Sequence, residues 1–174
     1  MKLVALDAQS WERLFEIPLF GWPRVLAVSP DGTTAYQTMR WLNGVLIVDL
    51  QQHKVVDRIS FETPTFAPEG KDAHGPALTP DGHELWLTTQ TSDDVAVIRT
   101  SDRKLLQRIP VGDDPNWIAF SPDGGLAVVS NTGSNSVSII NVGQRSVTAT
   151  LPVGKAPKRL AVGLVSVVSA TPDQ

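Results

Sequence analysis

A Pro-Asp-Gly turn motif occurs three times in this 174-residue sequence, and its spacing predicts a repeat protein. The copies lie at residues 29–32 (SPDG), 79–82 (TPDG) and 121–124 (SPDG), and successive copies are 50 and 42 residues apart. Proline presets φ, aspartate can bond to its own backbone and glycine supplies a positive φ, so each copy predicts a tight turn. A repeat of this length is typical of propeller blades or solenoid turns.

Short apolar runs follow one another in the same order around each copy, and no helical periodicity is sustained. Each unit reads as four strands of about five residues separated by turn residues. First strands are expected at 25–28, 75–78, 117–120 and 160–162, second strands at 35–39, 85–89 and 126–129, third strands at 3–6, 45–48, 95–98 and 137–140, and fourth strands at 14–19, 55–61, 105–111 and 147–153. The predicted fold is all-β, a propeller-type array of four-stranded antiparallel blades. We expect three complete units, partial units at both ends, and one domain over 1–174.

The motifs of the third unit resemble the YVTN-type β-propeller repeat family. They are residues 121–124, residues 128–131 (VVSN) where the family's name motif would lie, residues 133–137 (GSNSV), and residues 151–154 (LPVG), which repeat 109–112 (IPVG). The resemblance covers essentially the whole chain, which looks like the C-terminal part of a longer member. Such a fold hosts unrelated activities, so the resemblance implies architecture without fixing a function.

Members of that family usually have about seven blades, and the partial units leave three arrangements open. The two partial units could complete one blade and close a four-bladed ring, two chains could form an eight-bladed ring as a homodimer, or the chain could be an open part of a longer propeller. No Pro-Asp-Gly occurs at 163–166, where a fourth copy is expected. This absence favours the third arrangement.

Composition limits the classes of function and partner. A net charge of −3 with interspersed signs gives no footprint for nucleic acid. The absence of cysteine excludes disulfides, iron–sulfur clusters, thiolate metal sites and a cysteine nucleophile. No apolar window is long enough to span a membrane, and the apolar run at 1–6 is too short for a signal peptide. The family resemblance implies a periplasmic or cell-surface location, whereas the residues leave the compartment unknown.

Four polar residues begin the successive first strands and are expected to meet at the mouth of the central channel. They are Arg24, His74, Asn116 and Lys158, which follow one another at intervals of 50, 42 and 42 residues. Their convergence predicts a site for a small anionic ligand or a protein partner. The competing interpretation is that strand entries are solvent-exposed and accept any polar residue.

The connection at 61–74 is eight residues longer than expected and lies on the same rim. It carries Glu69 and Asp72 beside His74, a set that could act in acid–base chemistry or bind a cation, as in a lactonase-like propeller. Haem domains of the cytochrome d1 type are also propellers resembling this family, which suggests His74 as a haem ligand. No second histidine maps to this mouth, so we predict no metal site. Trp41, in a loop, is a candidate platform for a sugar or an aromatic ring.

No catalytic motif of the hydrolase, zinc-protease or P-loop type occurs in the sequence. The sequence therefore favours a noncatalytic binding or interaction module without a cofactor. The alternative is a cofactor-binding or enzymatic fragment of an exported propeller, either haem d1-like or lactonase-like, with haem or a divalent cation bound.

Overall fold

The computed structural model describes residues 1–61 and 72–163, and every regular element within them is a β-strand. Blade 1 is a two-stranded sheet of β1 (Lys2–Leu6) and β2 (Arg13–Pro18). Three four-stranded sheets follow: blade 2 with β3 (Pro23–Val28), β4 (Thr34–Met39), β5 (Gly44–Asp49) and β6 (Lys54–Ser60), blade 3 with β7 (Ala73–Leu78), β8 (Glu84–Thr89), β9 (Asp94–Arg99) and β10 (Leu105–Pro110), and blade 4 with β11 (Pro115–Phe120), β12 (Leu126–Asn131), β13 (Ser136–Asn141) and β14 (Ser146–Pro152).

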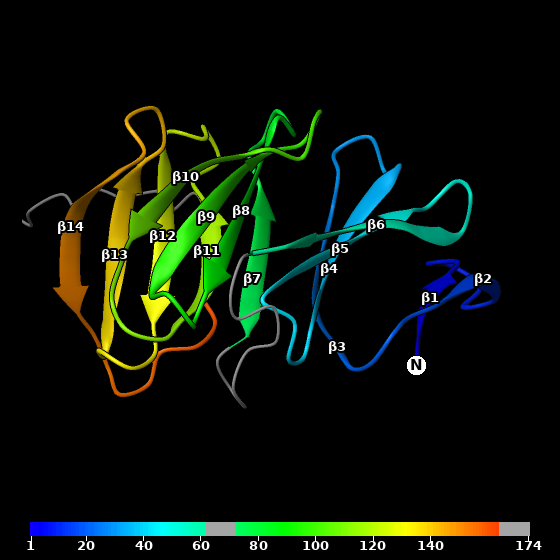
Figure 1. The fold of residues 1–174 in the computed structure, drawn as a ribbon, viewed down its shortest axis with the longest axis horizontal. Coiled ribbons are helices and arrows are strands. Elements are labelled where there is room, and N and C mark those ends of the chain that lie inside the picture. The colour runs from blue at the N-terminus through cyan, green and yellow to red at the C-terminus, as the bar shows by residue number, and fades with distance from the viewer. Residues whose placement is uncertain (62–71, 164–174) are drawn as a thin grey trace, which may run out of the picture.

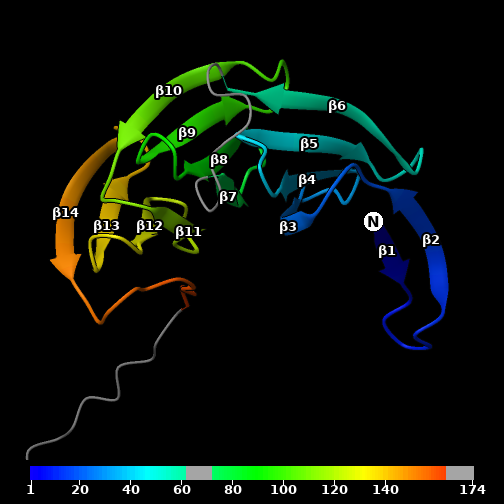
Figure 2. The same ribbon diagram turned by 60° about the horizontal axis from the view of Figure 1, so that its bottom comes forward.

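Each complete blade is an antiparallel meander in which the strands pair in chain order. The blades stand side by side (Figure 1) and follow one another along an arc. Figure 2 shows the first strands β3, β7 and β11 on the concave side of this arc and the fourth strands β6, β10 and β14 on its convex side. The arrangement is that of propeller blades around a channel, as the repeat spacing predicts.

The predicted order of strands is confirmed in all three complete blades, with ends that differ by one or two residues. The blade 1 strands occupy the third and fourth positions, as expected. The strand predicted at 160–162 is wrong, because residues 153–163 contain no regular strand. This segment nevertheless lies beside β12, since the carbonyl oxygens of Pro157 and Lys158 accept hydrogen bonds from Thr132 and Ser130.

The Pro-Asp-Gly motifs form the turns between first and second strands. In the first, the Gly32 amide donates to the Ser29 carbonyl oxygen at 2.8 Å and Gly32 has a φ of 71°. The Asp31 carboxylate accepts from the Ser29 hydroxyl at 2.5 Å and from the Thr33 amide at 3.0 Å, and these bonds lower the pKa of Asp31. The second and third turns repeat this pattern, so the three aspartates form turns, as predicted.

Buried hydroxyl groups connect each blade to the next near the channel. The Thr88 hydroxyl on β8 accepts a hydrogen bond from the Gly75 amide of its own blade at 2.8 Å and donates to the Asn116 carbonyl oxygen of blade 4 at 3.2 Å. Thr38 makes the same pair of bonds one blade earlier, and Ser130 makes it one blade later. A hydroxyl is suited to this position because one oxygen both accepts and donates.

Three apolar clusters hold neighbouring blades together. The cluster between blades 3 and 4 is built around Trp86, which is fully buried and meets Phe120 edge-on with ring centroids 5.4 Å apart. The cluster between blades 2 and 3 includes Val45, Phe61 and Leu87. Ile17 lies in the cluster that packs blade 1 on blade 2. Burial of these side chains between sheets is the main favourable term in such a packing.

The inner part of blade 2 lacks a neighbouring sheet on one side. Leu26 on β3 is 42% exposed, whereas Ile118, at the corresponding place on β11, is 3% exposed because blade 3 covers it. A homodimer ring, one of the three arrangements that the sequence leaves open, or the further blades of a longer propeller would cover this surface, and each stays a prediction.

Replacing Thr88 with valine tests the hydroxyl connection. Valine keeps the shape of the side chain but leaves the buried Gly75 amide without its partner and removes one of the two donors to the Asn116 carbonyl oxygen, so we expect the free energy of unfolding to fall by about 1–3 kcal/mol. Urea unfolding followed by tryptophan fluorescence measures the change. The matched control is Thr148→Val on the exposed strand β14, for which we expect a change within about 0.5 kcal/mol. Equal effects of the two substitutions would contradict the proposed role.

Candidate functional site

A polar pocket of about 370 Å³ lies where the first strands begin. Arg24, His74, Asn116 and Lys158, the four residues predicted to meet at the channel mouth, all line it, together with Gln90, Asp114, Thr132 and Arg159. The hydroxyl connections explain this convergence, because they hold the carbonyl oxygens of His74 and Asn116 at equivalent places in blades 3 and 4, and that of Lys158 at the equivalent place beside blade 4. The binding role of the four side chains stays a prediction.

Positive charge exceeds negative charge among the residues that line this pocket. Arg24, Lys158 and Arg159 are cationic, whereas Asp114 is the one acidic member of the set. The Arg159 guanidinium lies over the Trp117 ring, 4.9 Å from its centroid, which fixes one cation at the pocket edge. The arrangement favours an anion.

Arg24 is oriented by a buried acid beneath the pocket. Its Nη2 atom lies 3.0 Å from Oδ2 of Asp72, whose side chain is fully buried while that of Arg24 is 27% exposed. The same Asp72 oxygen accepts a hydrogen bond from the Trp41 amide at 2.9 Å. Asp72, which directly precedes β7, thus bonds both to Arg24 at the start of β3 and to the loop after β4. It acts as a structural anchor and does not line the pocket.

His74 is held in one tautomer by the backbone of blade 4. Its Nδ1 atom lies 3.1 Å from the Asn116 carbonyl oxygen, which can only accept, so Nδ1 carries the proton and Nε2 keeps its lone pair. No residue within 1–61 or 72–163 bonds to Nε2. Burial, followed by the positive charge of Arg24, lowers the pKa of His74, so the imidazole is neutral at pH 7.

Two of the other predicted residues lie away from the pocket, and a third lies outside the described residues. Trp41 has a φ of 66° and is 40% exposed, and the Arg40 guanidinium lies over its ring at 4.7 Å. It lines a separate apolar pocket between blades 1 and 2. Glu69 and the rest of 62–71 are not described, so the predicted set of Glu69, Asp72 and His74 is represented only by Asp72 and His74.

Four residues of the pocket were missed by reasoning from the sequence, although the repeat carried a signal for three of them. Gln90 and Thr132 directly follow the second strands of blades 3 and 4, and Asp114 precedes Asn116 by two residues. Extending the repeat register to those positions would have found them. Arg159 follows Lys158, and only the tertiary structure shows that both neighbours line one pocket.

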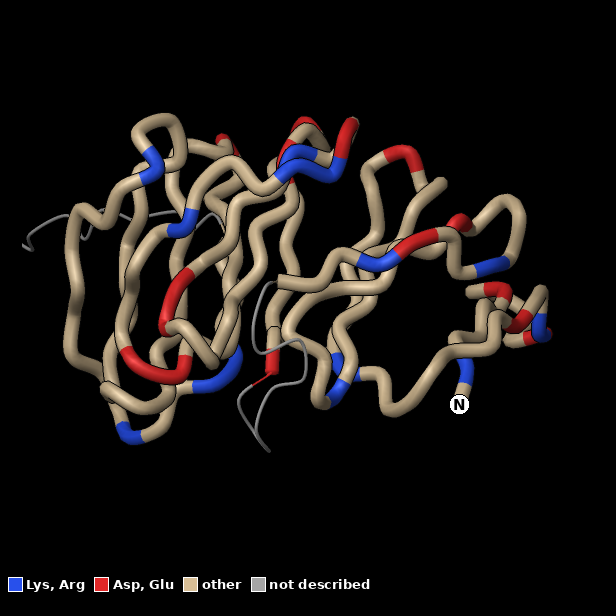
Figure 3. Tube along the Cα trace, in the orientation of Figure 1, with Lys and Arg blue, Asp and Glu red and all other residues tan. Residues whose placement is uncertain are grey.

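Lys, Arg, Asp and Glu positions occur along the trace of all four blades (Figure 3). Within the part of the chain that the structure describes, no three His, Cys, Asp or Glu side chains gather closely enough to hold a metal ion. Those same residues include no helix with the length and apolarity needed to cross a bilayer. The predicted haem or divalent cation therefore stays an alternative without a ligand set among these residues.

Residues 18–162 match the family described as "Lactonase, 7-bladed beta-propeller". The chain belongs to this lactonase family of seven-bladed β-propellers. The finding supports the resemblance to a propeller repeat family at the level of the fold and does not single out the YVTN type. Among curated proteins, none matches the sequence.

Solved structures similar to this lactonase-family chain share its fold. Hydrazine synthase from Kuenenia stuttgartiensis matches with a TM-score of 0.74 and 23% sequence identity over 86% of this chain. A functionally unknown protein from Desulfotomaculum acetoxidans matches with a TM-score of 0.74 and 19% identity over 90% of this chain. The periplasmic gluconolactonase PpgL of Pseudomonas aeruginosa matches with a TM-score of 0.68 and 22% identity over 80% of this chain. The matches cover 42%, 51% and 42% of those chains, so this chain spans about half of their length or less.

The lowered pKa of His74 predicts a pH dependence of stability. In the unfolded chain this histidine binds a proton near pH 6.5, whereas in the folded protein its pKa is lower. The contribution of neutral His74 to the free energy of unfolding is therefore fully present above about pH 6.5 and is lost as the pH falls through the pKa of the folded state. We expect the free energy of unfolding to fall more between pH 7.5 and pH 5 in the wild type than in His74→Gln. Urea unfolding at both pH values measures this difference, and equal losses would contradict the assignment.

Proposed function

We propose that the chain binds a small carboxylate at the channel mouth. The observation that carries the proposal is the convergence of Arg24, Lys158 and Arg159 on one polar pocket whose lining includes a single acid. Carboxylates are recognised by guanidinium and ammonium donors through charge-assisted hydrogen bonds. The buried amide side chain of Asn116 supplies a neutral partner for a hydroxyl group beside the carboxylate.

A sugar acid has the size and polarity that this pocket requires. The lining is polar and its volume is at the lower end of ligand-binding pockets. The family of lactonases and the gluconolactonase among the similar structures are consistent with a polyhydroxylated carboxylate, which is the product of opening a sugar lactone. Gluconate is therefore the first ligand to test.

Removing the charge of Lys158 tests the binding proposal. Lys158 is exposed, so Lys158→Met should fold normally while weakening gluconate binding about fivefold, the effect of losing one partly solvated ion pair. Isothermal titration calorimetry gives the Kd for the wild type and the variant. Lys104→Met, in the exposed turn between β9 and β10, is the matched control and should leave the Kd unchanged. Failure of the wild type to bind gluconate, or equal binding by both variants, would reject the proposal.

Hydrolysis of a lactone is the second candidate function, and the tautomer of His74 favours it. A neutral imidazole with a free Nε2 lone pair can remove a proton from water as the oxygen of that water adds to the lactone carbonyl carbon. The ring C–O bond then breaks, and the ring oxygen takes the proton from the imidazolium to become a hydroxyl group. Lys158 or Arg159 would stabilise the negative charge that develops on the carbonyl oxygen.

Substitution of His74 separates the two candidate functions. If the protein hydrolyses glucono-δ-lactone, His74→Gln should reduce kcat by about 100-fold or more, the usual contribution of a general base. Acid release followed with a pH indicator measures the rate above the spontaneous reaction. His83→Gln, in the turn that follows residues 79–82, is the control and should retain activity. A wild-type protein that binds gluconate but does not accelerate hydrolysis would leave binding as the function.

A further inference from the structure

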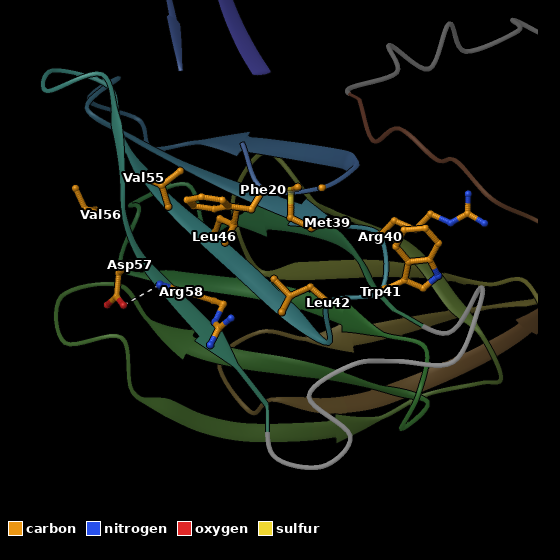
Figure 4. A pocket seen from close by; sticks show the side chains of 11 residues that line it. Phe20, Met39, Arg40, Trp41, Leu42, Leu46, Val55, Val56, Asp57 and Arg58 are labelled. Carbon is orange, nitrogen blue, oxygen red and sulfur yellow. Dashed lines mark hydrogen bonds between the residues drawn. The ribbon is translucent and has the colours of Figure 1, made fainter. Parts of the chain in front are cut away.

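A second, more apolar pocket of about 700 Å³ lies between blades 1 and 2 (Figure 4). Phe20 and Gly21, in the connection after β2, form one side of it. Met39 and Leu46 of blade 2 line the interior, and the pocket opens beside Arg58 on β6. Its volume is that of a typical small-molecule site.

Comparison with blades 3 and 4 shows that the pocket is a feature of the interface between blades. A pocket of about 480 Å³ lies at the corresponding place between these two complete sheets and is lined by Val111, Ser136, Val147 and Thr150. Val147 corresponds to Val55 of blade 2, and Thr150 corresponds to Arg58. The incomplete sheet of blade 1 is therefore not required for such a pocket to form.

Blade 3 fills the corresponding place with a charged network of its own. Nη1 of Arg108 on β10 donates to both carboxylate oxygens of Asp94, at 3.0 and 2.9 Å, and to the Ser92 hydroxyl at 3.0 Å. The guanidinium also lies over the Phe61 ring at 4.7 Å. Cation, acid and aromatic ring thus close the interface between blades 2 and 3.

Blade 2 keeps the cation of this network and lacks its partners. Arg58 pairs with Leu46 across the strands, as Arg108 pairs with Ala96, so the two arginines occupy the same register. Gly44 stands where blade 3 has Asp94, and Leu42 stands where it has Ser92. The Arg58 side chain has no carboxylate partner within residues 1–61 and 72–163.

The backbone around Gly44 leaves no room for an acidic side chain at this position. A Cβ atom at Gly44 would lie 2.0 Å from the Ile59 carbonyl oxygen, so the backbone approaches too closely for any side chain. Asp57 also lines the pocket, but its carboxylate is paired with Arg103 of the β9–β10 turn and accepts a hydrogen bond from the Arg58 backbone amide. Among residues 1–61 and 72–163, no carboxylate is bonded to the Arg58 guanidinium, which leaves it available to a negatively charged ligand.

We propose that this pocket binds an amphipathic carboxylate, such as a medium-chain fatty acid. The carboxylate pairs with the Arg58 guanidinium in place of the missing aspartate, and the apolar chain lies along Leu46, Met39 and Phe20. Phe20 is 77% exposed in the protein alone, so an apolar chain against its ring removes that surface from water.

The far end of the pocket limits the length and polarity of the ligand. The Arg40 guanidinium lies over the rings of Trp22 and Trp41, at 5.4 and 4.7 Å from their centroids. Arg40 and Trp41 line the pocket on the side away from Arg58 (Figure 4). Arg40 and Arg58 lie at opposite ends of this pocket, and none of its lining residues also lines the polar channel mouth.

Methionine methyl NMR with decanoate as the probe tests the proposal at the site itself. The protein has two methionines, of which Met39 lines the pocket and Met1 does not. In 13C-methyl-labelled protein, decanoate should shift the Met39 methyl signal saturably, with Met1 as the internal reference. Arg58→Met should weaken the Kd about tenfold, and Arg58→Lys, which keeps the charge, should restore most of the affinity.

Matched variants separate this pocket from the channel mouth and from general hydrophobic binding. Arg99→Met removes another exposed arginine, and Lys158→Met removes a cation of the channel mouth; both should leave the decanoate Kd unchanged. Arg58→Glu should reverse the preference, so that decyltrimethylammonium binds more tightly than decanoate. The proposal would be overturned if decanoate caused no saturable shift of the Met39 methyl signal or if Arg58→Met left the decanoate Kd unchanged. Equal affinity of the wild-type protein for decanoate and decyltrimethylammonium would also overturn it.

Discussion

The hydroxyl bridge between neighbouring blades is the interaction on which the arrangement of this molecule depends. A single buried oxygen at Thr38 or Thr88 satisfies an amide of its own blade and a carbonyl of the next, and the Ser130 oxygen does the same for blade 4 and the segment that follows it. An unsatisfied buried amide or carbonyl costs more than one hydrogen bond contributes, so the bridge sets the spacing and orientation of successive first strands. The apolar clusters supply most of the stabilisation, but contacts between aliphatic side chains are not directional and specify register less strictly.

The channel mouth follows from this register. The bridged carbonyl groups belong to His74 in blade 3, to Asn116 in blade 4 and to Lys158 in the segment after blade 4, so their side chains emerge at equivalent points of the repeat and line one pocket. The same bond pattern selects the tautomer of His74, since its Nδ1 proton is engaged by the next blade. Backbone geometry thus decides both where the imidazole lies and which of its nitrogens can act on a ligand.

The pocket between blades 1 and 2 shows how one register position can be structural in one blade and available in another. Arg108 pairs with Asp94, whereas blade 2 has Gly44 at the position of Asp94, and Arg58 has no such partner among the described residues. The residue at one repeated position therefore decides whether the arginine beside the pocket has a partner within its own blade. Sequence repeats in a family of lactonase-type propellers can diverge in this manner without any change in strand order.

The sequence by itself determined the repeat, the strand order and the four positions that meet at the channel mouth, because turn chemistry and alternation of apolar residues are local properties. It failed at 160–162, where an apolar run predicts a strand, because a strand also requires a backbone partner and that is a property of the assembled sheet. Only the tertiary structure decided that Asp72 is a buried anchor for Arg24, that Arg159 joins the mouth and that Arg58 lacks the acid found beside Arg108. Each of these facts depends on which side chains from distant parts of the chain come within bonding distance, and neither composition nor periodicity specifies that distance.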